Sequence, residues 1–359
     1  MSARVYLDWN ASAPLRTEAR DAMVAALDVT GNPSSVHAEG RAAKGVIERA
    51  RGQVAELVGC KPAEVIFTSG ATEAASVLRH LPVSSAVCID ETAHDCLWAH
   101  FDLTGAGEPE AKGHVLAMGL ANSETGVITE PKAEEDGQWA YGAVRCGALL
   151  LDVVQAVGRI PWSFHWSGAT SAIVSAHKLG GPCGVGALIL KDGTDIDPVL
   201  LGGGQELGRR SGTENVAGIA GFGAACEAAA RDLSGGVWEE VERLRNILEA
   251  RLADGAKDTI FVGNDRLRLP NTSCFATPGW KGETQVMQMD LAGFAVSSGS
   301  ACSSGKVKTP RVLRAMGLDD RTAEGALRVS LGPTTKEDDV LRFADAWLAQ
   351  EKKFRQRAA

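Results

Sequence analysis

The stretch SAIVSAHKLGGP, residues 171–182, decides the fold class of this chain. Its first half is a short apolar run typical of a buried strand, and the glycines and proline that follow end that strand. Lys178 therefore leaves the predicted strand at its carboxyl end, the edge at which open α/β sheets bind ligands. An amine at that edge can form a Schiff base with a carbonyl cofactor, although a single lysine at a strand end is more often simply exposed.

Similar short apolar runs occur on both sides of this stretch. Strands are predicted over residues 64–70, 86–90, 114–121, 148–154 and 185–190. Residues 41–58, in contrast, place their apolar side chains at helical spacing. Because short strands alternate with longer segments, the sequence predicts an α/β fold with a mostly parallel sheet.

The pattern changes after Asn215. Two helices are predicted over 217–230 and 237–252, with Ser234 as a plausible cap of the second. Strand-like runs (259–263 and 326–332) and a final helix (338–352) follow. The sequence thus indicates a large α/β domain, residues 14–235, and a small α+β domain made of residues 1–13 and 236–359.

Composition excludes several classes of protein. The chain has 359 residues, of which 45% are hydrophobic, and a net charge of −8, which argues against nucleic acid or an anionic membrane as its main partner. No secretory signal or apolar run of about 20 residues is visible, so a cytoplasmic location is expected. The eight cysteines are scattered without a CxxC pair and predict neither a disulfide framework nor a metal site.

Polar residues follow three other predicted strands. Asp152 ends one of them, where a carboxylate can pair with a protonated pyridine nitrogen or simply cap a helix. Residues 68–73, TSGATE, form a turn rich in small residues and hydroxyls that suits a phosphate, although many strand-to-helix turns look similar. His94 follows a third strand, and an isolated histidine is more often structural than catalytic.

Taken in order, these segments resemble the cysteine desulfurases, a class V aminotransferase-like branch of the fold-type I pyridoxal-phosphate enzymes. They span nearly the whole chain in the order of that family. The matching segments are YLDWNASAP (5–13), GNPSSVH (31–37), FTSGATEA (67–74), ETAH (91–94), ANSETGV (121–127), DVVQAVG (152–158), SAHKLGGP (175–182), GGGQELGRRSGTEN (202–215), SSGSACSSG (297–305) and LRVSLG (327–332).

The resemblance implies a role for each matched residue. Lys178 would hold pyridoxal 5'-phosphate covalently and move the substrate Cα proton, while His94 would stack on the pyridine ring. Asp152 would pair with the pyridine nitrogen, and Gln155 would bond to the phenolic oxygen with Ser123 beside it. Arg328 and Asn32 would bind the substrate, L-cysteine. The phosphate would be held by Ala71, Thr72, Ser175, His177 and, from the second subunit of a homodimer, Thr213.

Cys302 lies in a run of small residues, 297–305, that cannot pack a core and predicts a mobile surface loop. Composition alone leaves an incidental free cysteine as plausible as a nucleophile. The resemblance implies that Cys302 receives the sulfur as a persulfide, and it indicates the longer-loop group that passes this sulfur to protein acceptors.

The chain departs from the family at several positions. Ser123 stands where an asparagine is usual, so its shorter side chain would reach the phenolic oxygen less directly. The segment between His94 and Asn122 and the tail after Cys302 are both shorter than in relatives. This puts docking of an iron–sulfur scaffold protein in doubt.

The sequence therefore predicts a cysteine desulfurase that converts L-cysteine and an acceptor thiol to L-alanine and a persulfide. A selenocysteine lyase or another class V lyase or transaminase is the alternative, and a non-catalytic binding protein is a third reading. The set of Lys178, His94, Asp152, Arg328 and Cys302 argues against the last. The acceptor stays open among iron–sulfur cluster assembly, tRNA thiolation and molybdenum-cofactor sulfuration.

Overall fold

The computed structural model describes residues 4–80, 86–101, 114–194, 196–198, 200–299 and 310–358. The chain divides into two compact units. Unit 1 consists of Met1–Ala13, Ala121–Ile128 and Ser234–Ala359, and unit 2 consists of Pro14–Leu120 and Thr129–Leu233. The expected division differs in one segment, because Ala121–Ile128 groups with unit 1 rather than with the larger α/β part.

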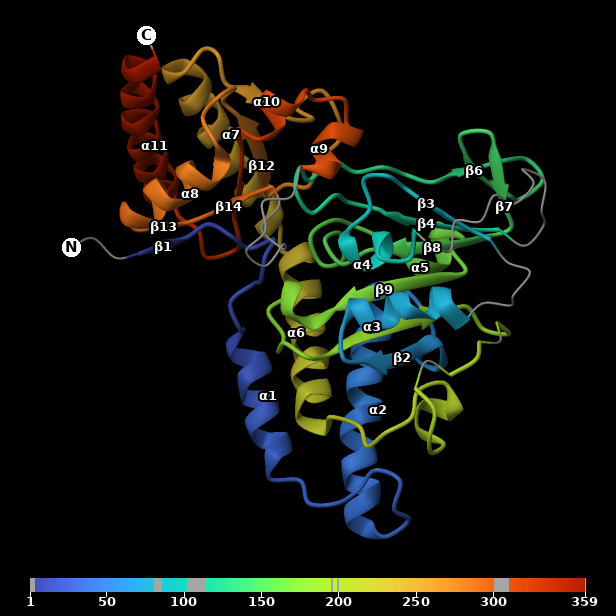
Figure 1. Ribbon diagram of the computed structural model, residues 1–359. Coiled ribbons are helices and arrows are strands. Elements are labelled where there is room, and N and C mark those ends of the chain that lie inside the picture. Colours follow the sequence, from blue (N-terminus) through green and yellow to red (C-terminus); the bar gives the residue numbers. More distant parts are fainter. Residues whose placement is uncertain are drawn as a thin grey trace. The chain divides into compact units, whose positions relative to one another are not determined.

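Unit 2 is built on a six-stranded sheet in the order β2-β10-β9-β8-β4-β3 (Figure 1). The strands are β2 (Val65–Thr68), β3 (Val87–Ile89), β4 (Val115–Gly119), β8 (Ala148–Asp152), β9 (Ser171–Ser175) and β10 (Gly186–Leu190). β3, β4, β8 and β9 pair in parallel, whereas β10 runs antiparallel to both β9 and β2. β2 therefore points the same way as β9, and the predicted mostly parallel sheet is confirmed.

Helices of unit 2 pack closely at positions where a glycine has no side chain to hold them apart. The helices are α1 (Thr17–Leu27), α2 (Ala38–Val58), α3 (Ala71–Ala75), α4 (Asp95–Trp98), α5 (Phe164–Ser167) and α6 (Val216–Ser234). A Cβ at Gly221 of α6 would lie 2.5 Å from Cγ of Met23 on α1, and one at Gly223 would lie 2.7 Å from Cα of Ala50 on α2. These two glycines let α6 approach both neighbouring helices.

A small three-stranded sheet in unit 2 is absent from the sequence-based prediction. It consists of β5 (Lys132–Ala133), β6 (Trp139–Tyr141) and β7 (Val144–Cys146) in antiparallel order. Strands of two or three residues with several polar side chains are too short to produce a recognisable alternation of polar and apolar positions.

Unit 1 contains a four-stranded sheet in the order β11-β12-β15-β14. Its core includes Trp347, which is fully buried and packs edge-on against Phe275 with ring centroids 5.2 Å apart. The strands and helices are β1 (Val5–Tyr6), β11 (Ile260–Phe261), β12 (Thr272–Ala276), β13 (Phe294–Ala295), β14 (Ser297–Ser298), β15 (Ala326–Ser330), α7 (Val237–Gly255), α8 (Gly282–Leu291), α9 (Arg311–Ala315), α10 (Asp320–Ala323) and α11 (Glu337–Ala358). β1 pairs in parallel with β13, which ties the start of the chain to this unit.

One predicted helix cap is wrong. Ser234 is the last residue of α6, and α7 starts after Gly236, whose φ of 73° is left-handed. α6 extends past its predicted end at residue 230, so Ser234 belongs to the last turn of α6 and does not cap α7. Glycine is favoured at such a position because it has no Cβ to strain a left-handed backbone.

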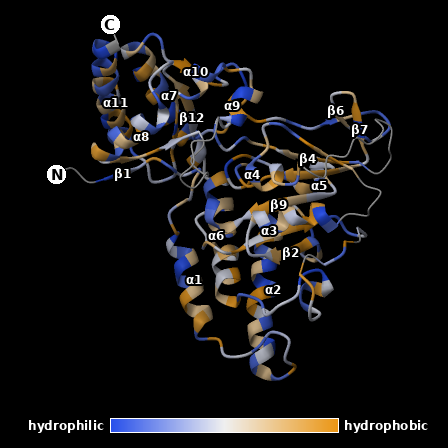
Figure 2. Cartoon of the chain, viewed as in Figure 1, coloured by the Kyte–Doolittle hydropathy of each residue, from blue (hydrophilic) through white to orange (hydrophobic). Residues whose placement is uncertain are grey.

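Polar and apolar residues mix along the helices, whereas the strands of the six-stranded sheet are mainly apolar (Figure 2). The side chains of β10 are all buried. Across the described residues, we find no helix whose length and hydrophobicity would suit a membrane span.

Candidate active site

Four parallel strands of unit 2 end in polar segments at the same edge of the sheet. α3 begins at Ala71 after β2, and His94 follows β3. Asp152 is the last residue of β8, and the 3-10 turn Ala176–Lys178 follows β9. Because parallel strands share one carboxyl edge, residues that are far apart in the sequence meet there.

Asp152 is the buried centre of this group. One nitrogen of His94, the Cys96 sulfur and a carboxylate oxygen of Asp152 all lie within 4.8 Å of one another. Oδ1 of Asp152 accepts a hydrogen bond of 2.9 Å from the Val154 N–H, and the Cys96 thiol is 3.8 Å from Oδ2. Burial raises the pKa of Asp152, and the nearby His94 and Lys178 oppose that shift. Such a carboxylate would be stabilised by a cationic N–H donor.

His94 is oriented by the helix that it caps. Its Nδ1 accepts a hydrogen bond of 3.2 Å from the Cys96 N–H at the start of α4. In the neutral ring the proton is therefore assigned to Nε2. The capping bond fixes the ring beside Asp152 rather than leaving it free to rotate.

Arg159, which the sequence analysis does not identify, connects two predicted site residues. Its Nη1 donates to Oε1 of Gln155 at 2.6 Å, and its Nη2 donates to the backbone carbonyl of Lys178 at 3.4 Å. Arg159 is only 3% exposed. The four-residue spacing from Gln155 in QAVGR was the available signal, because a buried arginine needs polar partners nearby.

Several hydrogen-bond donors lie at the same edge of the sheet. Within the described residues, the Ser175 hydroxyl makes no hydrogen bond, and the first N–H groups of α3, from Ala71 and Thr72, have no acceptor within the helix. Burial, followed by the charge of Lys178, lowers the pKa of His177 to about 4. His177 is therefore neutral near pH 7 and can donate one hydrogen bond. The set suits an anion such as a phosphate.

Arg328 lies in unit 1, where it is already paired. Its Nη2 donates to the Asp8 carboxylate at 2.7 Å, and its Nη1 donates to the carbonyl of Ser123 at 3.0 Å. Nε is buried and has no partner in the described part of the chain. Ser123 thus contacts Arg328 through its backbone, and it belongs to unit 1 whereas Gln155 belongs to unit 2. Asp8 is a further polar neighbour that the sequence analysis does not single out.

Three predicted site residues are not part of the Lys178 group as described. Asn32 is exposed in the connection between α1 and α2, where its Oδ1 accepts from the Ser34 N–H at 2.9 Å. Thr213 is exposed in the segment that precedes α6. Cys302 lies outside the described residues.

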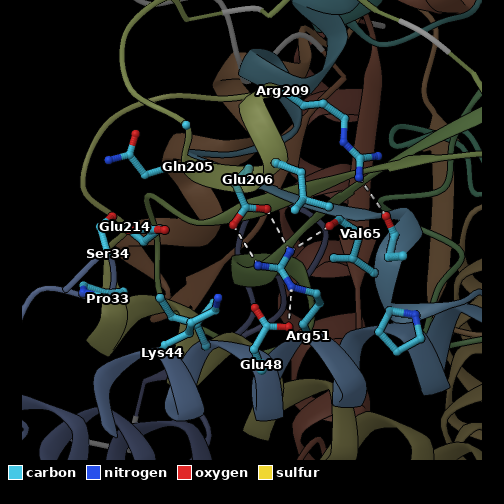
Figure 3. Close-up of a pocket in the computed structure, with 15 residues that line it drawn as sticks. Pro33, Ser34, Lys44, Glu48, Arg51, Val65, Gln205, Glu206, Arg209 and Glu214 are labelled. Atoms are coloured by element: carbon cyan, nitrogen blue, oxygen red, sulfur yellow. Dashed lines mark hydrogen bonds and ion pairs between the residues drawn. The ribbon is translucent and has the colours of Figure 1, made fainter. Parts of the chain in front are cut away.

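The Asn32 and Thr213 segments line one cavity of about 730 Å³ in unit 2 (Figure 3). Pro33, Ser34, Lys44, Gln205 and Glu214 are among the residues that line it (Figure 3). Its lining includes an ion pair that could not be predicted from the sequence. Arg51 donates twice to Glu206, each bond at 2.8 Å, and Glu206 also accepts from the Phe67 N–H at 2.9 Å. The pair anchors the loop that carries Thr213.

Comparison with known proteins identifies the family. The family model described as aminotransferase class-V matches residues 5–87 and 110–343. A cysteine desulfurase of Cereibacter sphaeroides is 37% identical over 95% of this chain and 94% of its own length. The chain belongs to the cysteine desulfurase family. It is therefore an enzyme, and the resemblance drawn from the sequence motifs is confirmed.

Two further relatives agree. The cysteine desulfurase IscS of Dictyoglomus turgidum is 34% identical over 94% of this chain and 92% of its own. Among solved structures, a NifS-like protein of Rickettsia africae superposes with a TM-score of 0.83 at 27% identity, covering 96% of this chain and 98% of its own. Both the sequence and the fold of this desulfurase family therefore extend over nearly the entire chain.

Proposed function

We propose that this chain uses pyridoxal 5'-phosphate and works as a homodimer to convert L-cysteine and an acceptor thiol to L-alanine and a persulfide. The buried Asp152 beside Lys178 and His94 carries the proposal. A carboxylate with no cationic hydrogen-bond donor among its described contacts fits the protonated ring nitrogen of that cofactor. Membership of the cysteine desulfurase family supports the choice of substrate.

The residues of unit 2 divide the binding of the cofactor among them. Lys178 holds it covalently, Asp152 pairs with its ring nitrogen, and His94 lies against the ring. The phosphate is bound by the Ala71 and Thr72 N–H groups at the start of α3, by the Ser175 hydroxyl and by the neutral His177 ring. When bound, the cofactor supplies an electron sink for the carbanion formed at the substrate Cα. Gln155, held by Arg159, donates its amide N–H to the phenolic oxygen.

Two basic residues move the proton and orient the substrate. Lys178, at the end of β9, takes the proton from Cα of cysteine. Arg328 binds the substrate carboxylate, for which the planar guanidinium fork is suited. Asp8 and the Ser123 carbonyl hold that fork in place, and the unpartnered Nε remains available as a donor.

Cys302 is proposed as the sulfur acceptor. Its thiolate attacks the substrate sulfur, a new S–S bond forms, and the C–S bond of cysteine breaks. The carbon fragment takes up one proton at Cβ, Lys178 returns the other to Cα, and alanine leaves. An external thiol then removes the outer sulfur of Cys302 and restores its thiol. Ser123 stays close to the phenolic oxygen in this proposal, and Asn32 contributes to substrate binding.

The decisive experiment separates cofactor binding from sulfur transfer. Lys178→Ala should lose the visible absorbance of the cofactor, and borohydride should link no cofactor to it. Cys302→Ser should bind cysteine and change the cofactor spectrum but form almost no alanine, because a hydroxyl is a far poorer nucleophile than a thiolate. The alanine yield and the mass of the Cys302 peptide are measured. After one equivalent of cysteine, this peptide should be one sulfur atom heavier in wild type.

Cys183→Ser is the matched control, because Cys183 is an exposed thiol close to Lys178 in the sequence. It should retain full turnover. Normal alanine production by Cys302→Ser, or extra sulfur found on Cys183 instead, would refute the assignment of the acceptor thiol.

A further inference from the structure

Three possible metal ligands converge in unit 2 away from the Lys178 group. Cys88 lies in β3, His114 immediately precedes β4, and Cys146 ends β7 just before β8. One ligand atom from each lies within 4.8 Å of the other two. At about 3.3 Å per residue, β8 puts roughly 13 Å between its first residue, next to this cluster, and Asp152 at its end. The cluster therefore lies toward the amino-terminal edge of the sheet.

His114 is the feature that points to a missing ligand. It is only 3% exposed, and neither ring nitrogen has a hydrogen-bond partner in the described part of the chain. Its backbone carbonyl accepts from the N–H groups of Gly147 and Ala148 at 3.0 and 3.3 Å, which fixes it beside Cys146. Buried polar side chains are normally satisfied, so an imidazole placed between two thiols without a partner needs an explanation.

The two thiols interact with each other. The Cys88 and Cys146 thiols are hydrogen-bonded to each other. Cysteine binds a metal as the thiolate, so an ion bound here would take the place of the protons on both thiols.

We propose that Cys88, His114 and Cys146 bind one zinc ion. Zinc favours sulfur and nitrogen ligands in a tetrahedron, with bonds of about 2.3 Å to sulfur and 2.0–2.1 Å to nitrogen, which sets sulfur atoms about 3.8 Å apart. Shifts of about 1 Å bring the three ligand atoms to that spacing. Two thiolates and a neutral imidazole balance the charge of the ion, and the two displaced thiol protons pass to solvent. Water fills the fourth position beside the half-buried Cys88.

The site would join parts of the chain that are otherwise linked only through the sheet. Cys146 belongs to the three-stranded sheet β5-β6-β7, whereas Cys88 belongs to β3, at the edge of the six-stranded sheet, and His114 immediately precedes its neighbour β4. The sequence contains no CxxC pair, so only the pairing of β3, β4 and β8 brings these residues together. A bound ion would fix the small sheet to this edge.

The test uses the full-length enzyme loaded with its cofactor, so that the His94, Cys96 and Asp152 group is not open to metal. Protein treated with chelator and reductant is dialysed against zinc, and bound zinc is measured by mass spectrometry. Wild type should retain one equivalent, while Cys88→Ser, Cys146→Ser and His114→Ala should each bind at least tenfold more weakly. Cobalt substituted for zinc should give a thiolate-to-cobalt charge-transfer band in wild type.

Two control variants exclude other thiols. Cys96→Ser and Cys60→Ser should each retain one equivalent of zinc, since neither residue belongs to the cluster. The cobalt spectrum needs no substitution, so it decides the matter even if a variant fails to fold. The proposal would be overturned if wild type takes up no zinc or if its cobalt complex shows no thiolate band. It would also be overturned if all three ligand variants retain zinc, or if reduction of a Cys88–Cys146 disulfide restores no binding.

Discussion

The buried ion pair between Arg51 and Glu206 makes a sharp prediction about stability. Side-chain exposure is 11% for Arg51 and 2% for Glu206, so Glu206→Gln leaves a guanidinium largely out of water without its carboxylate. The glutamine keeps the shape of the side chain and one acceptor oxygen. The change therefore tests charge rather than packing.

The expected cost follows from the contacts. Removing one partner of a buried ion pair destabilises a protein by about 3–5 kcal/mol. The lower end applies here, because Arg51 keeps the Val65 carbonyl at 2.8 Å and Glu48 at 3.2 Å. In a unit of this size, about 3 kcal/mol lowers the melting temperature by about 6–12 °C. Thermal unfolding followed by circular dichroism measures the shift.

Two further variants show whether the reasoning holds. Glu240→Gln removes a carboxylate that binds Arg243 at similar distances, 2.7 and 2.8 Å, but on the exposed surface, and it should leave the melting temperature unchanged. Arg51→Met combined with Glu206→Gln should recover part of the loss, since no unpaired charge then stays buried. Equal shifts for Glu206→Gln and Glu240→Gln would refute the argument.

Two other predictions concern the phosphate site. The pKa of His177 is about 4 in the folded protein against about 6.5 unfolded, so the unfolded state alone binds a proton between these values. The cofactor-free enzyme should therefore lose stability as the pH falls from 6.5 to 4, and His177→Gln should lose less, measured as melting temperature against pH. Thr213→Ala should weaken cofactor binding by about tenfold in a spectroscopic titration, because it removes one hydrogen bond to a charged group. Sedimentation of this variant should still give a dimer. A catalytically competent wild-type monomer would contradict the shared site.

Most of the α/β unit could be predicted from the sequence because its strands are short, apolar and bounded by turns. The runs 148–154 and 171–177 become β8 and β9, and their polar ends, Asp152 and Lys178, lie at one edge as expected. The prediction succeeds here because burial and chain direction are both local properties of the sequence. Parallel pairing then brings the strand ends together without further information.

Contacts that depend on pairs far apart in the chain could not be predicted in the same way. Arg51 and Glu206 are each ordinary surface residues by type, and only the folded loop brings them together. Asp8 and Arg328 are likewise joined through β15, which receives a bridge from Asp8 at Ser330. The same holds for Cys88, His114 and Cys146, whose spacing along the chain matches no metal motif.

The two shifted pKa values at the carboxyl edge have a common physical meaning. Burial raises the pKa of Asp152 and lowers that of His177, so in both cases the protein alone disfavours the charged form. A ligand with a protonated nitrogen at one end and a phosphate at the other reverses both effects, since each charge stabilises the ionised form of its neighbour. Binding of such a ligand would thus recover free energy that is spent on desolvating these residues during folding. The edge is complementary to a zwitterionic ligand rather than to an anion or a cation alone.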